Sequence, residues 1–437
     1  MNDPQAEHNN NNPRESFIPV TRFALIDTLS KTVEDGGKRE ERARFFQLLA
    51  QWRHQDHQDR LLRLKERYLP FSPDRDTIRV LEFSDQQLKT MQSELIDEVA
   101  SMLERANYTH VDEEQLNRLL STHSAYGLEL KVDRLEYDEI MVYFRGAGEE
   151  RLEKRNWKKW FKKETLIVPT FKRLFLLLKL KPKQQRIEEL MDSEGISQKK
   201  AEKLVAKRRE KLPKTNSDDF IYLKLFKNIP QEDLEMMFPN TQVQFRLFDK
   251  IKLGMTAGGG TVAGVAGAAS KAMAAIAAAN PIALAGSIFG IVGIITRQVM
   301  NFFNTRNRYM LALSQRLYFH SLADNRGALT LLCDRGEEED IKEDLLMYHF
   351  LSHHPTPRDE LDQLDKKIEA YLYEQYQVQV DFDIDDALRR LERDGLIKEN
   401  EQKALSALSP QEAFQVLDQR WHERLSVLGS TTEESTG

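Results

Sequence analysis

The chain has 437 residues and a mass of 50.9 kDa, too long for one ordinary core, which predicts about two or three domains. Charged residues make up 31% and hydrophobic residues 40%, and the mean hydropathy is -0.58, which excludes a transporter built mostly of apolar spans. The net charge of -6 argues against a chain-wide polycation for nucleic acid, and the single cysteine excludes an internal disulfide and a Cys-based zinc or iron-sulfur site.

The first part of the chain predicts a leader and then helices. Residues 1–15 lack apolar periodicity and show neither a signal peptide nor a basic transit peptide, so they predict a disordered leader. Residues 16–135 predict a helical domain, in which apolar side chains recur at helical spacing. The clearest run is Leu88, Met91, Leu95, Val99 and Leu103.

Residues 136–250 predict a small antiparallel α+β domain. Apolar and polar side chains alternate from Glu139 to Arg145, as in a half-buried strand. Similar signals recur at residues 165–168, 171–180, 220–226 and 243–248. Residues 183–217 predict a basic insertion within this domain.

Positive charge is concentrated in this middle part. Residues 151–214 hold 21 Lys and Arg against 8 Asp and Glu, a net of +13, whereas residues 334–437 hold 12 against 26, a net of -14. Residues 199–211 predict a solvated helix. Aromatic and basic side chains interleave before it, a composition that suits an anionic bilayer surface or single-stranded nucleic acid, and lipid is the predicted partner. These side chains are Trp157, Lys158, Lys159, Trp160, Lys162 and Lys163.

Residues 251–303 predict a two-helix transmembrane hairpin. Between residues 253 and 296 there are 44 residues and one charge, Lys271, and the turn signal Asn280-Pro281 divides them into two arms. Counted from residue 282 to residue 303, the second arm would extend about 33 Å, enough to cross a bilayer core. Glycines four apart would let the arms pack closely. They are Gly260 and Gly264 on the first arm and Gly286 and Gly290 on the second.

The flanks of this hairpin predict its direction. Arg297 would lie at the membrane surface, and Lys271 would lie at the far interface or line a water path. The basic flanks place both large parts on one side, with the termini cytoplasmic in a bacterial inner membrane or, alternatively, in an organelle. A buried helical hairpin and a conditional hairpin remain the alternatives. A phosphate-binding loop is disfavoured because no Gly directly precedes Lys271.

After a connecting helix at residues 304–333, residues 334–429 predict an acidic winged-helix-like domain, and residues 430–437 predict a disordered tail. A DNA-reading third helix would present basic and amide side chains, but five carboxylates oppose three arginines between residues 383 and 394. Packing against a protein is therefore favoured over nucleic acid. His349 and His353 share a helix face, yet no third metal ligand is evident and polar helix-end histidines are expected.

Three stretches carry a family resemblance. They are LKLFKNIPQEDLEMMFPNTQV from residue 223, LYFHSLADNRGALTLLCDRGEEEDIKEDLLMY from residue 317 and DFDIDDALRRLERDGL from residue 381. With FIPVTR at residue 17 and LKERYLPFSPD at residue 64, they resemble the transmembrane-protein-143-like family, a membrane family of a domain of unknown function. The resemblance implies a membrane protein with a paired hydrophobic segment and implies no catalytic residues.

The sequence thus predicts an α+β, mostly helical membrane protein of unknown activity. The leading hypothesis is a non-enzymatic scaffold or partner-binding protein on the cytoplasmic face, whose acidic C-terminal domain binds a protein partner. The alternative is a pore-forming or conditional membrane effector that forms homo-oligomers through the glycine-rich hairpin. No catalytic nucleophile, metal cluster or cofactor loop is predicted.

Overall fold

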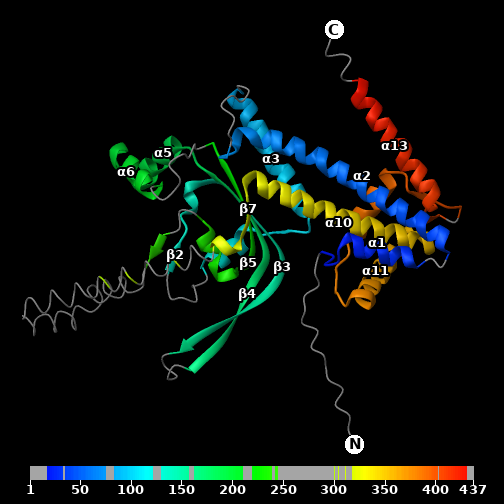
Figure 1. Ribbon diagram of the computed structural model, residues 1–437. Coiled ribbons are helices and arrows are strands. Elements are labelled where there is room, and N and C mark those ends of the chain that lie inside the picture. Colours follow the sequence, from blue (N-terminus) through cyan, green and yellow to red (C-terminus); the bar gives the residue numbers. More distant parts are fainter. Residues whose placement is uncertain are drawn as a thin grey trace, which may run out of the picture.

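A computed structural model gives the architecture of the chain as a mixed helix and sheet protein (Figure 1). The structure describes residues 17–32, 35–74, 83–121, 129–156, 162–209, 219–238, 242–244, 317–401 and 403–430, with the single residues 300, 304 and 311. In Figure 1 the sheet lies between the α5 and α6 pair at one end and α11 and α13 at the other.

The N-terminal part is helical, as its periodicity predicts. The helix α3 begins with a capping box, in which Ser84 accepts from the backbone of Gln87 and the Gln87 side chain accepts from the backbone of Ser84. The elements are α1 (Arg22–Lys31), α2 (Gly36–Tyr68), η1 (Leu69–Phe71), α3 (Asp85–Arg105), β1 (Thr109–His110) and α4 (Glu113–Ser121).

The centre is a five-stranded antiparallel sheet in the order β1-β3-β4-β5-β7. Strands β3 and β4 form a long hairpin in which Val142 pairs with Leu176 and Asn156 with Lys162. Leu174, Leu176 and Leu178 face one core and Phe175 and Leu177 the other, as the period of two requires. The strands are β3 (Tyr137–Asn156), β4 (Lys162–Leu180), β5 (Ile221–Pro230) and β7 (Ser321–Asp324), after the short η2 (Arg134–Glu136).

Smaller elements lie beside the sheet. A second, two-stranded sheet pairs β2 (Glu129–Lys131) with β6 (Gln242–Gln244). The helices α5 (Lys183–Glu194) and α6 (Gln198–Arg209) join β4 to β5, and η4 (Gln231–Met237) follows β5. The predicted strand at residues 243–248 is therefore seen in part, and its residues from 245 on lie outside the described ones.

The helix α10 (Asn325–His353) connects the sheet to the C-terminal elements (Figure 1). Its first turns cover one face of the sheet, and its last turns pack against α1, α2 and α12. The short hairpin that a winged-helix pattern includes after its third helix is seen as β9 (Ile397–Glu399) paired with β10 (Ala404–Ala407). The remaining elements are β8 (Thr356–Pro357), η5 (Arg358–Glu360), α11 (Leu361–Tyr376), α12 (Ile384–Arg393) and α13 (Pro410–Ser430).

The predicted transmembrane hairpin is corrected by the structure. Every helix that the structure describes is too short or too polar to pass through a lipid bilayer. This finding contradicts the transmembrane part of the predicted fold class and the predicted membrane localisation. Apart from Met300, residues 251–303 themselves lie outside the described residues. The prediction weighed the absence of charge too heavily, because 19 of the 25 residues from 255 to 279 are Gly, Ala, Ser or Thr, which offer little apolar area to lipid.

Candidate functional site

A cationic pocket lies where the N-terminal segment, the sheet and α10 meet. Its volume is about 410 Å³. Five cationic side chains and two carboxylates line it, a formal net charge of +3, together with Asn228 of β5 and residues 17–21 of the N-terminal segment. The cations are Arg145, Lys172, Arg173, Arg335 and Lys342, the carboxylates are Glu338 and Glu339, and the others are Phe17, Ile18, Pro19, Val20, Thr21 and Asn228.

An ion pair on α10 fixes the N-terminal wall of the pocket. The backbone N–H of Ile18 donates to Glu339 at 2.9 Å, and Lys342 Nζ donates to the carbonyl of Ile18 at 2.5 Å. Lys342 and Glu339 also bond each other at 2.7 Å. Both side chains are buried, so residue 18 is held through both of its backbone polar groups. Thr21 then caps α1 by accepting from Ala24.

Arg145 of β3 is the most buried cation of the sheet wall, at 6% exposure. Its guanidinium carbon lies 4.5 Å from the ring centre of Phe17 and 5.4 Å from that of Tyr108. One terminal nitrogen donates to the carbonyl of Ala106 at 3.1 Å and lies 3.9 Å from Glu339. The buried Nε finds no hydrogen-bond partner within the described part of the chain. A ring-stacked arginine is thus held in place with a donor to spare.

Arg173 of β4 adds a second guanidinium that is poorly compensated. Burial lowers its pKa, and the nearby cations Arg145 and Arg335 lower it further, while Tyr108 opposes them. Arg173 donates to the carbonyl of Lys172 at 2.8 Å, and no carboxylate pairs with it among the residues that the structure describes. Like charges gathered in a partly buried site favour an added anion. The pocket therefore has the electrostatics of an anion site.

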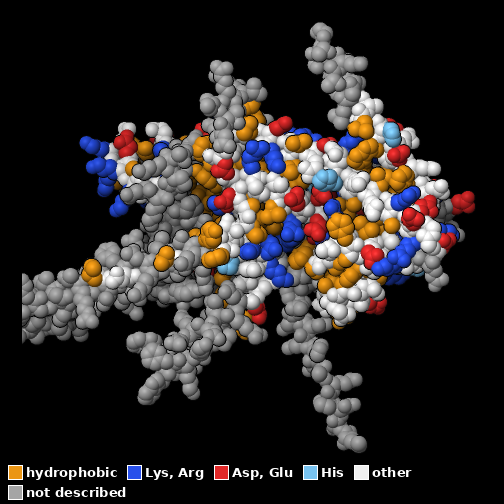
Figure 2. Space-filling view, in the orientation of Figure 1, with side chains coloured by type: hydrophobic (Ala, Val, Ile, Leu, Met, Phe, Trp, Pro, Cys, Tyr) orange, Lys and Arg blue, Asp and Glu red, His pale blue; other side chains and the backbone are white. Residues whose placement is uncertain are grey.

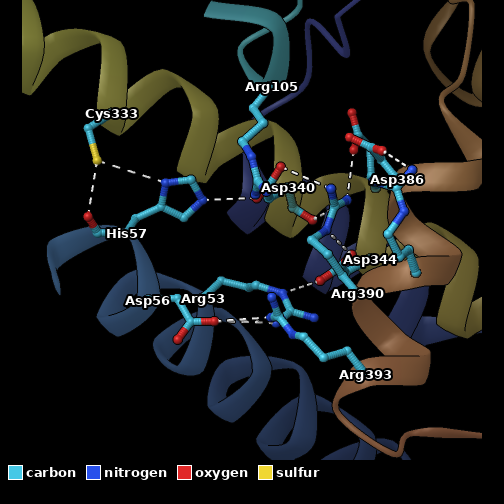
Figure 3. A network of polar contacts seen from close by, with 12 residues as sticks. Arg53, Asp56, His57, Arg105, Cys333, Asp340, Asp344, Asp386, Arg390 and Arg393 are labelled. Carbon is cyan, nitrogen blue, oxygen red and sulfur yellow. Dashed lines mark hydrogen bonds and ion pairs between the residues drawn. The ribbon is translucent and has the colours of Figure 1, made fainter. Parts of the chain in front are cut away.

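The opposite flank of α10 holds a buried network of ion pairs (Figure 3). Arg390 of α12 donates to Asp344 at 2.8 Å, to Asp340 at 3.1 Å and to Glu343 at 2.8 Å. Arg53 of α2 bonds both Asp344 and Asp394. Burial raises the pKa of Asp340, but Arg390 first, and then His57 and Arg105, outweigh it and hold this pKa at about 2. Arg390 of α12 is thus buried and forms its ion pairs with carboxylates of this chain.

Cys333, His57 and Asp340 form a chain of successive side-chain contacts beside this network. Cys333 Sγ lies 3.8 Å from His57 Nδ1, and His57 Nε2 lies 2.9 Å from Asp340 (Figure 3). This order is that of a nucleophile, base and orienting acid. However, burial raises the pKa of the Cys333 thiol to about 12, and its exposure is 1%. The thiol stays protonated near neutral pH, so the arrangement packs the core rather than attacking a substrate.

The helix-end histidines face an arginine. A terminal nitrogen of Arg42 lies 3.3 Å from His349 Nδ1 and 3.4 Å from His353 Nε2. Burial first, and then His353 and Arg42, lower the pKa of His349 to about 3. Within the described residues no group of three His, Cys, Asp or Glu side chains is placed to hold a metal ion.

The sites predicted from the sequence lie elsewhere. Lys162 and Lys163 begin β4, and their side chains are not described. The other predicted residues fall outside the described ones. They are Trp157, Lys158, Lys159, Trp160, Gly260, Gly264, Lys271, Gly286, Gly290 and Arg297. The predicted homo-oligomer, and the protein partner predicted for the acidic C-terminal domain, stay predictions. No sequence pattern predicts the pocket, because its cations come from β3, β4 and α10 and meet only in the fold.

Residues 137–327 match the family model of a protein of unknown function, DUF3754. The matched segment includes the sheet wall of the pocket, with Arg145 and Arg173, and ends in the first turn of α10. The match supports a domain of unknown function and does not extend to the narrower transmembrane-protein-143-like resemblance. No solved structure matches the chain.

Proposed function

We propose that the chain is a non-enzymatic binding protein whose ligand carries a phosphate or carboxylate group, held in the cationic pocket. The observation that carries the proposal is the meeting of Arg145, Arg173 and Arg335 with too few carboxylates to neutralise them. Guanidinium groups favour these anions because their planar N–H donors match two oxygens at once.

The pocket also sets the size of the ligand. A volume of about 410 Å³ falls in the range of about 300–1,000 Å³ that is typical of small-molecule sites. Phe17 and Val20 are half-buried at its rim, beside the charged wall. A small organic anion, with an apolar part against these residues, fits this lining better than a bare inorganic ion.

The lining supports binding rather than catalysis. It contains no thiol or imidazole, and its one hydroxyl side chain, Thr21, already caps a helix. Glu339 bonds Lys342 and the backbone of Ile18, and Glu338 pairs with Arg335 at 3.2 Å. No carboxylate or hydroxyl group in this lining is therefore free to act as a nucleophile or a general base.

Calorimetric titration of the full chain with pyrophosphate and with citrate tests the proposal. We expect binding of at least one of them with one site per chain, and Arg173→Gln should weaken it at least tenfold. Arg63→Gln is the matched control, because Arg63 is exposed on α2 away from the pocket. Absence of binding by both anions, or equal binding by the Arg173 variant, would contradict the proposal.

A further inference from the structure

The helices α5 and α6 form a small pair with a core of its own. Leu190, Ala201 and Val205 are buried between them. The connection has three residues and begins at Gly195, which ends α5 in the left-handed conformation with φ 61°. Gly195 N–H donates to the carbonyl of Met191 at 3.0 Å, and the next helix starts from Ser197. Two short helices joined by a three-residue turn with glycine have the plan of a helix-turn-helix module.

Arginines attach this pair to η2, the short helical turn that precedes β3. Glu136, which is 1% exposed, accepts from Arg186 at 3.0 Å and from Arg208 and Arg209 at 3.3 Å. Arg208 also pairs with Asp133 at 2.8 Å. The arginines of α5 and α6 are thus neutralised within the fold, and the position of the pair is fixed.

The lysines of α6, unlike these arginines, point to solvent and form no ion pair with the described residues. Lys199, Lys200, Lys203 and Lys207 are all exposed, and the described residues offer none of them an ion pair. At about 100° per residue these four lysines fall within an arc of about 100°, opposite the buried Ala201 and Val205. Lys199, Lys203 and Lys207 succeed one another at about 6 Å along the helix axis. In Figure 2 Lys and Arg side chains gather along the outer edge of this pair.

We infer that this lysine face of α6 binds the phosphate backbone of double-stranded DNA without reading its sequence. A major groove of about 12 Å admits one α-helix, and lysines act there as point charges on phosphates. The pair lies at the end of the molecule opposite α11 and α13, so a duplex can approach it (Figure 1). The acidic remainder of the chain confines this contact to the basic end.

Other polyanions fit this surface less well. A helix that lies on a bilayer buries an apolar face in the lipid, but the apolar face of α6 already packs on α5. Single strands are held by stacking on aromatic rings, and neither α5 nor α6 contains an aromatic residue. The charge segregation explains why a net charge of -6 for the whole chain is compatible with a local DNA contact.

Fluorescence anisotropy of the full chain with a 20-base-pair duplex tests the inference. With about four phosphates neutralised, the logarithm of the affinity should fall with the logarithm of salt at a slope of about -3.6, or about 150-fold from 50 to 200 mM. The triple variant Lys199→Gln, Lys203→Gln, Lys207→Gln should bind at least tenfold more weakly, with a slope near about -0.9. Two duplexes of unrelated sequence should bind equally.

Two further variants separate charge from fold. Lys199→Arg, Lys203→Arg, Lys207→Arg should retain the affinity, since it keeps the charge. Lys89→Gln, Lys366→Gln, Lys367→Gln removes three exposed lysines elsewhere and should leave binding unchanged. Unchanged binding by the α6 Gln variant would overturn the inference. So would tighter binding to a single strand of equal length, or to vesicles of 70% phosphatidylcholine and 30% phosphatidylserine.

Discussion

Two regions of one helix treat charge in opposite ways. On one flank of α10, Asp340 and Asp344 meet Arg53 and Arg390 in a buried network of ion pairs. On the other flank, next to Glu339, cations of β3 and β4 outnumber the carboxylates. The ion-paired flank joins α2, α10 and α12. On the other flank the cationic side chains outnumber the carboxylates, so positive charge is left for an added anion.

The difference also separates two roles for buried charge. Removing one partner of a closed network leaves an uncompensated charge behind, which destabilises the fold strongly. Removing one cation from a crowded cationic wall relieves repulsion instead. Substitutions on the two flanks should therefore change the free energy of unfolding by different amounts and with opposite signs.

Arg390→Leu should lower the free energy of unfolding by about 3–5 kcal/mol, because three buried carboxyl groups lose their common donor. Urea unfolding followed by circular dichroism measures the change. The control is Arg389→Leu, next in the chain, whose side chain is 73% exposed and pairs with Asp386. Its effect should stay within about 0.5 kcal/mol. A small effect of the Arg390 variant would show that the network is not what holds these helices.

His349 should make stability depend on pH. Its folded pKa is about 3, below the usual value of about 6.5, so the folded chain binds fewer protons than the unfolded chain between these values. Its contribution is present above pH 6.5 and is lost as the pH falls toward 3, by up to about 1.4 kcal/mol per pH unit.

Unfolding measured from pH 7 to pH 4 checks this dependence in His349→Gln. The variant should show a shallower loss of stability than the parent chain, and His422→Gln, which changes an exposed histidine on α13, should follow the parent. Parallel curves for the His349 variant and the parent would contradict the prediction.

Glu339→Gln should destabilise the chain by about 1.5–3 kcal/mol, because Lys342 loses its charged partner and the Ile18 N–H loses a charged acceptor. Trypsin should also cleave faster near residue 22, since the N-terminal segment is no longer held. The neighbouring Glu338→Gln removes only a half-buried pair with Arg335 and should change stability by less than about 1 kcal/mol. Equal effects of the two variants would refute the backbone clamp.

Arg173→Gln should change the free energy of unfolding by no more than about 0.5 kcal/mol in buffer without multivalent anions, and a small gain is expected. The reason is that its neighbours are cations and that it forms no carboxylate pair within the described residues. Pyrophosphate should then stabilise the parent chain and not this variant in thermal unfolding. A loss comparable to that of Arg390→Leu would place Arg173 among the structural charges.

Local patterns predicted the local elements well. The alternation from Glu139 to Arg145 lies in β3, and the helical run from Leu88 to Leu103 lies in α3. Residues 397–399 and 405–407 pair as β9 and β10. These features depend on neighbours in sequence, which a single chain displays directly.

Local sequence patterns could not predict the ion-pair network or the cationic pocket on the two flanks of α10. Arg53 and Asp344 are 291 positions apart, and the acidic stretch from Glu337 to Asp344 indicates, by its sequence alone, only a local negative charge. Its burial depends on cations of α2 and α12, which no spacing rule connects to it. The transmembrane prediction was wrong for a related reason. A segment without charged residues can pack inside a protein as well as in lipid, and its sequence alone does not decide between them.

The length of α10 has a consequence for the segment that matches the family model. That segment ends at residue 327, two residues after α10 begins. The sheet face with Phe175, Leu177 and Leu223 is covered by α2, α3 and the following turns of α10, all outside the matched boundaries. A fragment cut at those boundaries would expose this apolar sheet face to water and should aggregate. The smallest unit that folds on its own therefore extends on both sides of the matched residues.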